Sequence, residues 1–473
     1  MQEQVLMKGC GPMKVLLSAL VLCTLLSMQA VICCASPKDG KCNIVLITID
    51  TLRADHLSCY GYERKTSPVI DAIAEGGIVC SNVYAPSSWT APSMTSLFTS
   101  VYPVNHGVVH GIGYTEDNAL NVQEIFSPDL TTLAEVLQAN GYSTFGVSAN
   151  PHLSEKFKFD RGFDYFTCLP FEDAKAVNEA AFAWQDKVKK AEKFFLWVHY
   201  IDPHYPYTAQ KPWIGAYASQ SETRFLLNIP PQSWWGLKTM VKEVKDDPKL
   251  LKHLIALYDS EINYADAHIG VLMEQLGLYE ETLVVITSDH GEEFLEHGET
   301  GHGHNLYQQR LHVPLIVKLP QGSKHGVLNQ PLSLINVMPT ILEIAGLDAT
   351  ATAMGVSFRE KAGLFSWIKK KLTGADEDYI YAELDTMATL KAVLAPPWKF
   401  IYNRRDKTGQ LYNIISDPLE LNDRALVETG ECDRLKEELL RWADTTKRYP
   451  AKRYDVELSP EEKEKLKGLG YLQ

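Results

Sequence analysis

Two acidic side chains and one imidazole follow strand-like segments in this sequence. Asp50 comes directly after the apolar, β-branched run 43–49, and Asp289 and His290 follow the similar run 283–287. A buried carboxylate is costly unless a cation or several hydrogen-bond donors accompany it. For Asp50 alone, capping of a helix that begins near Thr51 would be sufficient. The clustering of three such groups instead predicts one divalent ion (Ca²⁺, Mg²⁺, Mn²⁺ or Zn²⁺) held by Asp50, Asp289 and His290.

A segment rich in serine and threonine, residues 87–99, offers a hydroxyl that such an ion could activate. Thr90 has the residue type of a helix N-cap, and Pro92 fits the first helical turn. A helix that starts here directs its N–H groups and positive dipole end towards an anion. Capping alone would explain this segment, so a catalytic role for Thr90 depends on the rest of the chain.

Strand-like runs alternate with helix-like patterns through the first 345 residues, which is typical of a parallel sheet with crossover helices. In such sheets the chemistry gathers at the carboxyl ends of the strands. The ends of three of these runs carry Asp50, Asp202 with His204, and Asp289 with His290. The expected strands are 43–49, 141–148, 194–200, 283–287 and 313–319, and the expected helices are 67–75, 130–139, 254–276 and 337–345.

The pattern changes after about Gly346. Short strands are expected over 379–384, 390–394, 399–403 and 410–415, followed by a helix over 433–449. The predicted fold class is therefore α/β, with a large sheet flanked by helices and a small C-terminal antiparallel sheet with one helix. We expect a catalytic domain over 37–350, then a linker and a small α+β subdomain over 351–473. Residues 213–247 interrupt the alternation, either as an excursion near the site or as aromatic core.

The N-terminal segment, residues 1–36, predicts export. Lys14 precedes a long apolar run that ends in small residues, which is typical of a signal peptide. A transmembrane anchor is the alternative, because the run approaches the length of a membrane span. Cys33 and Cys34 leave lipid attachment open. We expect a periplasmic or secreted protein, or one anchored on the outer side of a membrane.

Charge and cysteine content exclude other classes of protein. The formal net charge of −13 argues against a nucleic-acid partner, which usually meets a basic face. An anionic substrate remains compatible, since a metal ion outweighs a diffuse surface charge locally. Beyond the N-terminal segment the cysteines show no zinc-site spacing and are odd in number, so free and mostly buried thiols are expected: Cys42, Cys59, Cys80, Cys168 and Cys432.

From Asn43 to its end, the chain resembles the sulfatase family of the alkaline phosphatase superfamily. The resemblance implies a mixed, mostly parallel sheet, a metal-dependent ester hydrolase and a nucleophile at Thr90. It rests on motifs that occur in one order, namely 43–55, 87–103, His199-Tyr200-Ile201-Asp202-Pro203-His204-Tyr205-Pro206-Tyr207, Ser288-Asp289-His290-Gly291-Glu292, Glu296-His297-Gly298, Gly301-His302-Gly303-His304-Asn305-Leu306-Tyr307 and 313–316.

Several positions depart from the family pattern. A sulfatase is expected to have Cys or Ser, converted to formylglycine, where this chain has Thr90, and Arg where it has Met94. Thr51 replaces a second acidic ligand, and His290 replaces the usual Asn. No formylglycine is expected, because threonine cannot be converted to it.

The resemblance also suggests roles for the remaining groups. Thr90 would attack the substrate and contact the metal ion, and His204 with one of His302 and His304 would bind anionic oxygens or protonate the leaving group. Of the last two, which would face opposite ways in an extended segment, His304 is favoured. A second metal on Asp202, His204 and one of this pair is the less favoured arrangement. Arg53 could hold a substrate oxyanion, or form a salt bridge instead.

These features predict a hydrolase of phosphate esters, phosphodiesters or phosphonates. A sulfated threonine lacks the second hydroxyl by which formylglycine expels sulfate, whereas a phosphorylated threonine can be resolved by in-line attack. Three alternatives remain: an arylsulfatase-like sulfuric ester hydrolase, a phospho-group transferase, and a non-catalytic anion-binding protein. The expected partner is an anionic small molecule or an ester derived from the cell envelope.

Overall fold

The computed structural model describes residues 42–110, 122–207, 247–278, 280–322, 325–358, 379–385 and 389–455, together with 213, 217, 242, 244–245 and 459–460. The N-terminal segment 1–36, residues 359–378, where the linker is expected, and most of 213–247 lie outside the described residues. Within the described part, no helix has the length and apolar character needed to cross a lipid bilayer.

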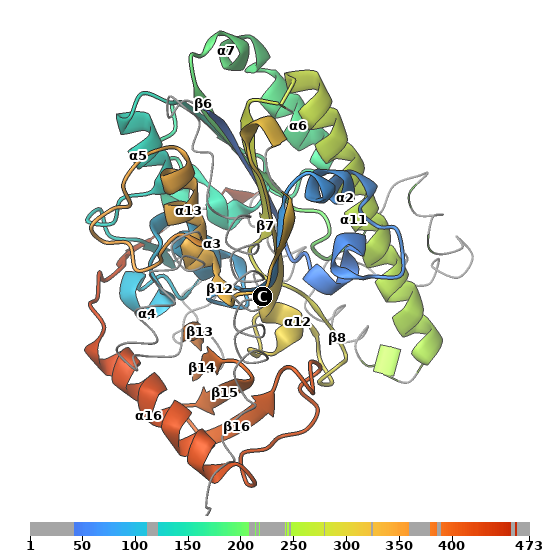
Figure 1. Cartoon of the computed structure of the whole chain (residues 1–473), viewed down its shortest axis with the longest axis vertical. Coiled ribbons are helices and arrows are strands. Elements are labelled where there is room, and N and C mark those ends of the chain that lie inside the picture. Colours follow the sequence, from blue (N-terminus) through green and yellow to red (C-terminus); the bar gives the residue numbers. More distant parts are fainter. Residues whose placement is uncertain are drawn as a thin grey trace, which may run out of the picture.

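A nine-stranded sheet forms the centre of the molecule (Figure 1). Its order is β11-β2-β10-β7-β1-β6-β4-β5, with β12 paired to β2. The pairs around β1 are parallel, whereas β10 runs antiparallel to both β2 and β7. The strands are β1 (Asn43–Ile49), β2 (Ile78–Tyr84), β4 (Ser143–Ser148), β5 (Tyr165–Cys168), β6 (Phe194–Tyr200), β7 (Thr282–Ser288), β10 (His312–Lys318), β11 (Gly326–Leu328) and β12 (Leu332–Ser333).

Helices cover both faces of this sheet because its central strands are apolar on both sides. In β1, Ile44 and Leu46 join one core cluster, and Val45 and Ile47 join the other. The first face is covered by α3 (Thr90–Thr99), α5 (Leu133–Ala139) and α13 (Val337–Ile344). The second is covered by α2 (Pro68–Glu75), α6 (Ala174–Phe182), α7 (Gln185–Lys190) and α11 (Pro248–Leu276).

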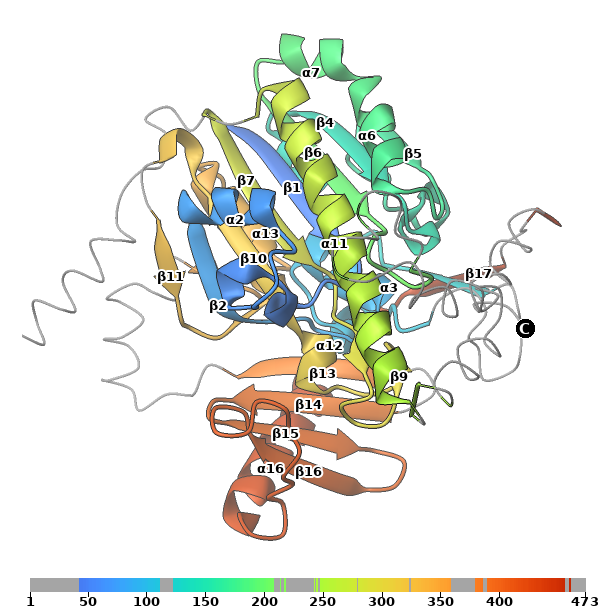
Figure 2. The ribbon, with the colours of Figure 1, turned by 90° about the vertical axis from the view of Figure 1, so that its right-hand side faces the viewer.

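Four antiparallel strands and one long helix form the C-terminal subdomain below the main sheet (Figure 2). One face of this small sheet joins the core of the catalytic domain through residues such as Ala392, and the other packs against α16 through residues such as Phe400. The elements are β13 (Ile380–Asp385), β14 (Thr389–Ala395), β15 (Trp398–Asn403), β16 (Thr408–Asn413) and α16 (Thr429–Thr445).

The chain then returns to the catalytic domain, where β17 (Lys452–Asp455) pairs with β3 (Val122–Ile125). The remaining short elements connect the larger ones. They are α4 (Pro103–His106), α12 (Gln308–Leu311), β8 (Glu293–Phe294), β9 (Thr300–Gly301), η1 (Ala54–His56), η2 (Ser58–Tyr60), η3 (Pro151–Leu153), η4 (Glu155–Phe157), η5 (Pro320–Gly322) and η6 (Leu334–Asn336).

The predicted strands and helices are confirmed, with shifted boundaries and additions. Helix α5 begins at Leu133 because Thr132 and Glu135 form a capping box there. Helix α11 begins six residues before the expected Leu254, at Pro248, where Asp247 caps it. Strand β2, whose interior carries Ser81 and Asn82, was not predicted. The five cysteines from Cys42 onward are free, as predicted, but only Cys42 and Cys80 are buried, whereas Cys59, Cys168 and Cys432 are half-buried.

Candidate active site

Two adjacent parallel strands place the acidic residues side by side. Ile49 of β1 is in register with Ser288 of β7, so Asp50 and Asp289 follow equivalent strand ends. Both carboxylates and the imidazole of His290 are fully buried. Ligand atoms of these three side chains lie within 4.8 Å of one another. The predicted cluster is therefore assembled by the register of the sheet.

The lone pairs in this cluster suit a cation. His290 Nδ1 lies 2.9 Å from the carbonyl oxygen of Gly291, which can only accept, so Nδ1 carries the ring proton. The unprotonated Nε2 then lies 3.7 Å from Asp50 Oδ1 and 3.3 Å from Asp289 Oδ2. Neither of these two carboxylate oxygens has a hydrogen-bond partner among the described residues. Three electron-rich atoms thus converge in a buried space, and a divalent ion fits this donor set.

The two carboxylates are electrostatically unequal. Burial acts to raise the pKa of Asp50, but a hydrogen bond from His199 and the nearby imidazoles outweigh it and hold that pKa below its ordinary value. For Asp289, burial and the charge of Asp50 both raise the pKa. Asp289 Oδ1 is satisfied by the backbone N–H groups of His290 and Thr51, at 2.9 and 3.2 Å. Thr51 has a φ of 57°, an uncommon backbone conformation for a β-branched residue.

Thr90 lies next to the cluster, at the start of α3. Its hydroxyl oxygen is 3.3 Å from His290 Nε2 and 3.3 Å from Asn150 Nδ2, and its exposed fraction is 2%. The expected N-cap role is corrected: Trp89 occupies the N-cap, and Thr90 is the first helical residue. From this first helical position, the hydroxyl of Thr90 faces the cluster.

A hydrogen-bond relay that sequence reasoning missed orients Asp50. Trp197 Nε1 donates to Thr48 Oγ1 (2.9 Å), and Thr48 Oγ1 lies 2.8 Å from His199 Nδ1. His199 Nε2 is 3.3 Å from Asp50 Oδ2, which also accepts from Asn150 Nδ2 at 2.7 Å. The polar residues Thr48 and His199 inside otherwise apolar strands were the available signal, and Asn150 follows a predicted strand.

His302 and His204 extend the site beyond the cluster. The ring centroid of His302 is 4.5 Å from that of His290 and 5.0 Å from that of His204. His304 is half-buried, and its charge helps to lower the pKa of His302, for which burial is the main cause. Gly303 N donates to the carbonyl oxygen of Ser88 (2.9 Å), which joins this loop to the Thr90 segment. The structure thus places the His302 ring against that of His290, and the choice between His302 and His304 as the substrate-contacting residue stays a prediction.

The Glu292 side chain contacts the His302 ring through a hydrogen bond. Its Oε1 lies 3.2 Å from His302 Nδ1, and its Oε2 accepts from the Tyr207 hydroxyl at 3.4 Å. Burial raises the pKa of Glu292 to about 8 and lowers that of His302. Burial thus disfavours the charged forms of both groups, and the contact between them is a hydrogen bond that orients the His302 ring.

Two of the predicted residues have other partners. Arg53 forms salt bridges with Asp55 (2.7 Å) and Glu296 (2.6 Å), so its contacts favour the salt-bridge interpretation over substrate binding. Asp202 Oδ2 accepts from the backbone N–H of Ala174 at the start of α6. Burial raises the pKa of Asp202 to about 6. Among the described residues, Asp202 is not part of a group with metal-site spacing.

A buried acid pair with an imidazole, next to a hydroxyl on this fold, defines an ester hydrolase with the alkaline phosphatase-like fold. The chain belongs to the sulfatase family, whose profile matches residues 42–347. Enzymes of this family are ester hydrolases that use a divalent metal ion, and the cluster of Asp50, Asp289 and His290 fits one.

Similar proteins act on more than one class of ester. The uncharacterized sulfatase YidJ of Escherichia coli K12 is 24% identical over 418 residues, which covers 79% of this chain and 83% of that protein. An N-acetylglucosamine-6-O-sulfatase of Bacteroides thetaiotaomicron is 23% identical and is covered to 88%, as is this chain. The solved phosphonate monoester hydrolase of Agrobacterium radiobacter has the same fold, with a TM-score of 0.64 and 18% identity over 85% of this chain and 95% of its own. These likenesses leave the substrate class open.

Proposed function

We propose that this protein is a metal-dependent hydrolase of phosphate esters, phosphodiesters or phosphonates, in which the Thr90 hydroxyl is the nucleophile. The observation that carries the proposal is the position of Thr90 Oγ1, 3.3 Å from His290 Nε2 and 3.3 Å from Asn150 Nδ2. Both of these contacts of the hydroxyl are with side chains, namely those of His290 and Asn150. The hydroxyl is therefore available to a substrate that reaches the cluster.

The cluster would hold the metal ion that the family uses. Asp50 Oδ1, Asp289 Oδ2 and His290 Nε2 would be its ligand atoms, because they are the electron-rich atoms that converge. A divalent ion at this position supplies a lowered pKa for a neighbouring hydroxyl and neutralises anionic oxygens of the substrate. The Nδ1–H of His290 donates to Gly291 and so fixes the ring with Nε2 towards the two acids.

The side chains of this protein perform the remaining steps. Asn150 Nδ2 donates to Thr90 Oγ1 and holds the hydroxyl in place. The Thr90 hydroxyl loses its proton to solvent, and attack of its Oγ1 on phosphorus forms a phosphothreonine or phosphonothreonine ester and breaks the bond to the leaving alkoxide. His302 or His204 supplies the proton that this alkoxide needs. Water then attacks the phosphorus, releases the product and restores the threonine hydroxyl.

The residue types around Thr90 favour phosphorus over sulfur. A threonine has a single hydroxyl, so a sulfated Thr90 has no internal route for expelling sulfate. Met94, where a sulfatase is expected to have Arg, is fully buried in the apolar core and provides no positive charge. Arg53 and Arg310 are both ion-paired with glutamates. A metal ion and the histidines of the site would therefore carry most of the anion binding.

The proposed substrate is an anionic small molecule or an ester derived from the cell envelope. This part of the proposal rests on the export signal expected at residues 1–36, which would take the protein out of the cytoplasm or to the outer side of a membrane. Relatives include an enzyme named for an N-acetylglucosamine-6-O-sulfate, so a sugar ester is compatible with the site.

The test is turnover by the full-length protein combined with mass spectrometry of the peptide that contains Thr90. Aryl phosphate, bis-aryl phosphate, aryl phosphonate and aryl sulfate esters are offered with each candidate metal ion. Because phosphate and sulfate adducts are nearly isobaric, the aryl phosphonate is the decisive substrate, since its adduct has a mass of its own. Thr90→Val is the matched control, as it removes the hydroxyl and keeps the shape.

The expected result is hydrolysis of a phosphorus ester and a phosphonate adduct on Thr90. Turnover of aryl sulfate alone would replace the proposal with a sulfuric ester hydrolase. Transfer to an added alcohol in preference to water would indicate a phospho-group transferase. Binding of anions without turnover of any ester would indicate a non-catalytic protein.

A further inference from the structure

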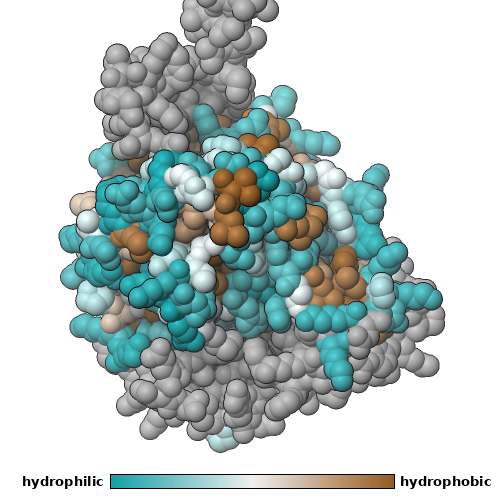
Figure 3. Space-filling view, turned by 90° about the horizontal axis from the view of Figure 1, so that it is seen from below, coloured by the Kyte–Doolittle hydropathy of each residue, from teal (hydrophilic) through white to brown (hydrophobic). Residues whose placement is uncertain are grey.

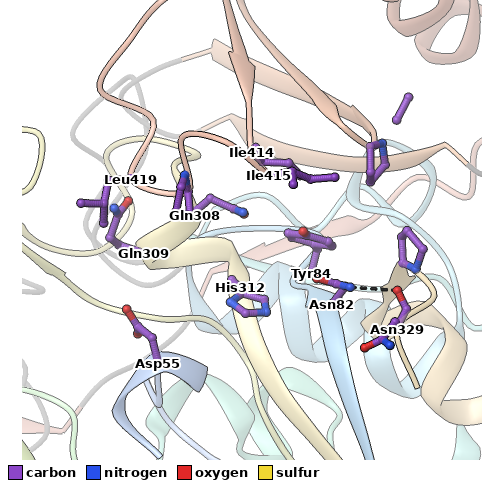
Figure 4. Close-up of a pocket in the computed structure, with 14 residues that line it drawn as sticks. Asp55, Asn82, Tyr84, Gln308, Gln309, His312, Asn329, Ile414, Ile415 and Leu419 are labelled. Carbon is purple, nitrogen blue, oxygen red and sulfur yellow. Dashed lines mark hydrogen bonds between the residues drawn. The ribbon is translucent and has the colours of Figure 1, made fainter. Parts of the chain in front are cut away.

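A cavity of about 690 Å³ lies where the C-terminal subdomain meets the catalytic domain. Its lining comes from the end of β2, from α12, from the start of β10 and from the segment 414–419. Figure 4 shows Gln308, His312 and Tyr84 across the middle of this cavity, below Ile414 and Ile415. None of the residues of the candidate metal cluster lines it. Its size is within the range of about 300–1,000 Å³ that is usual for small-molecule sites.

The cavity contains a buried amide without partners. Gln309 is 4% exposed, and neither its Oε1 nor its Nε2 has a hydrogen-bond partner among the described residues. The Oε1 of the neighbouring Gln308 is also buried and unsatisfied within that part of the chain. An unsatisfied buried polar group is costly, so a ligand that can both donate and accept would stabilise this wall.

The charges around the cavity favour an uncharged ligand. No lysine or arginine is among its lining residues, and Asp55, the acidic side chain there, is paired with Arg53. His312 Nε2 lies 2.8 Å from the carbonyl oxygen of Ser81, so Nε2 donates and Nδ1 remains an acceptor. Burial lowers the pKa of His312 and keeps its ring neutral. A sulfate or phosphate group would find no counter-charge here.

Apolar surface accompanies these polar groups. The rings of Tyr84 and His312 lie with their centroids 5.7 Å apart, and Ile415 and Leu419 stand at the rim with exposed fractions of 72% and 46%. Viewed from below, apolar side chains of the molecule gather in separate patches among hydrophilic ones (Figure 3). Sugars combine hydroxyls that donate and accept with apolar ring faces, and both kinds of surface are present in this cavity.

An extended peptide fits the cavity less well. Peptides often bind by adding a strand to an open sheet edge. Strand β2 is paired with β10 on one side and with β11 and β12 on the other. The outer edge of β16 is covered, because Arg424 N donates to Leu411 O at 2.7 Å. Among the described strands that approach the cavity, neither of these offers an open edge.

We propose that this cavity is a second binding site, separate from the ester-cleaving site, which takes an uncharged saccharide. The amides of Gln308 and Gln309 bind its hydroxyls, and Tyr84, His312 and Ile415 contact its apolar faces. The wall that carries Gln309 also supports the catalytic loop: a Cβ added at Gly291 would lie 2.1 Å from Gln309 O. The two sites therefore stand back to back across the residues that follow His290.

Saturation-transfer NMR on the full-length protein tests this proposal. The probes are maltose, cellobiose, lactose and diacetylchitobiose, each at about 10 mM to detect weak binding, with glucose 6-sulfate and a blocked trialanine as comparisons. Ile415→Arg closes the rim at an exposed position, and Gln309→Leu removes the buried amide. Val427→Arg, 64% exposed in the same subdomain and outside the cavity lining, is the matched control.

We expect saturation transfer to at least one neutral disaccharide, and a loss of about fivefold or more in affinity in Ile415→Arg and Gln309→Leu. Val427→Arg and Thr90→Val should bind as the unaltered protein does, and Ile415→Arg should still hydrolyse a small aryl ester. The proposal is overturned if no disaccharide binds, if both cavity variants bind normally, or if trialanine or glucose 6-sulfate binds more tightly than every disaccharide. Loss of sugar binding in Thr90→Val would place the sugar in the ester-cleaving site instead. If Gln309→Leu does not fold, the rim variant alone decides.

Discussion

The imidazole Nε2 of His290 lies 3.3 Å from the hydroxyl oxygen of Thr90, although the two residues are 200 positions apart in the chain. Because Nδ1 of the same ring donates to Gly291, Nε2 accepts from the threonine hydroxyl when no ion is bound. One ring nitrogen thus faces both the nucleophile and the acids. Loss of the contact between the His290 ring and Thr90 would remove the link between the proposed nucleophile and the two carboxylates.

The hydroxyl of Thr90 can be tested by shape-matched substitutions. Thr90→Val should lower kcat/KM on the best substrate by about 10³-fold or more, because the nucleophile is lost. Thr90→Ser keeps a hydroxyl and should retain activity to within about tenfold. Steady-state kinetics with thermal denaturation of each variant checks this. Equal activity in Thr90→Val and the unaltered protein would rule out the nucleophile.

Asn150 should act as a positioning residue for Thr90 and Asp50. Asn150→Leu removes both contacts and should lower kcat by about 10- to 100-fold with a smaller change in KM, equivalent to about 1–3 kcal/mol. Asn178→Leu is the matched control, since Asn178 is a buried asparagine that bonds Tyr200 and the carbonyl oxygen of His268 away from the site. A similar loss of kcat in both variants would reduce the role of Asn150 to folding.

Metal binding should reverse the order of stability of the unaltered protein and the Asp289→Asn variant. In chelator, Asp289→Asn should melt at a higher temperature than the unaltered protein, because it relieves the repulsion between Asp289 and Asp50. With metal at about 100 times its Kd, the unaltered protein should gain about 2.7 kcal/mol and become the more stable of the two. Differential scanning calorimetry with each ion measures this crossing.

The control for this crossing is a buried carboxylate elsewhere. Asp266 accepts hydrogen bonds from the backbone N–H groups of Val69 and Ile70 at the start of α2. Asp266→Asn should change stability equally with and without metal. A metal response that is the same in Asp289→Asn and Asp266→Asn would remove Asp289 from the ligand set.

His106 should make the fold acid-sensitive. Burial lowers its pKa from 6.5 to about 3 and outweighs the contact of its Nε2 with the carbonyl oxygen of Pro92 at 3.2 Å, which acts to raise that pKa. Its Nδ1 accepts from the Val108 N–H, which suits the neutral ring. The contribution of the neutral His106 ring to the free energy of unfolding is therefore complete above pH 6.5 and is lost as the pH falls. The loss reaches about 2 kcal/mol at pH 5. Urea unfolding of the unaltered protein and of His106→Gln, each at pH 6.5 and at pH 5, measures the difference. An unchanged pH slope in the variant would contradict this assignment.

The buried ion pair of Lys399 and Glu420 should be sensitive to the loss of one partner. Their atoms are 2.8 Å apart, both side chains are fully buried, and Glu420 also accepts from the backbone N–H of Gln308. Lys399→Met leaves an unpaired carboxylate and should cost roughly 3–5 kcal/mol, whereas Lys399→Met with Glu420→Gln should recover part of that loss. Chemical denaturation checks both. Arg441→Ala, which breaks an exposed pair with Glu438, should cost less than about 1 kcal/mol.

The sequence predicted the candidate site best where a functional group directly follows a strand. Apolar runs located β1 and β7, and their shared direction placed Asp50 beside Asp289. The antiparallel direction of β10 could not be predicted, because its buried residues resemble those of a parallel strand. Asn150 and His199 were missed because their role depends on pairing between β6, β4 and β1, which is a long-range contact. The choice between His302 and His304 depended on loop geometry, which alternation alone does not determine.

The return of the chain from α16 to β17 has a consequence for access to the site. The C-terminal subdomain is secured to the catalytic domain by the shared core and by the pairing of β17 with β3. A body fastened at two separate places does not swing about a single hinge. Opening of the site by a rigid rotation of the C-terminal subdomain would therefore have to break the pairing of β17 with β3 or the shared core.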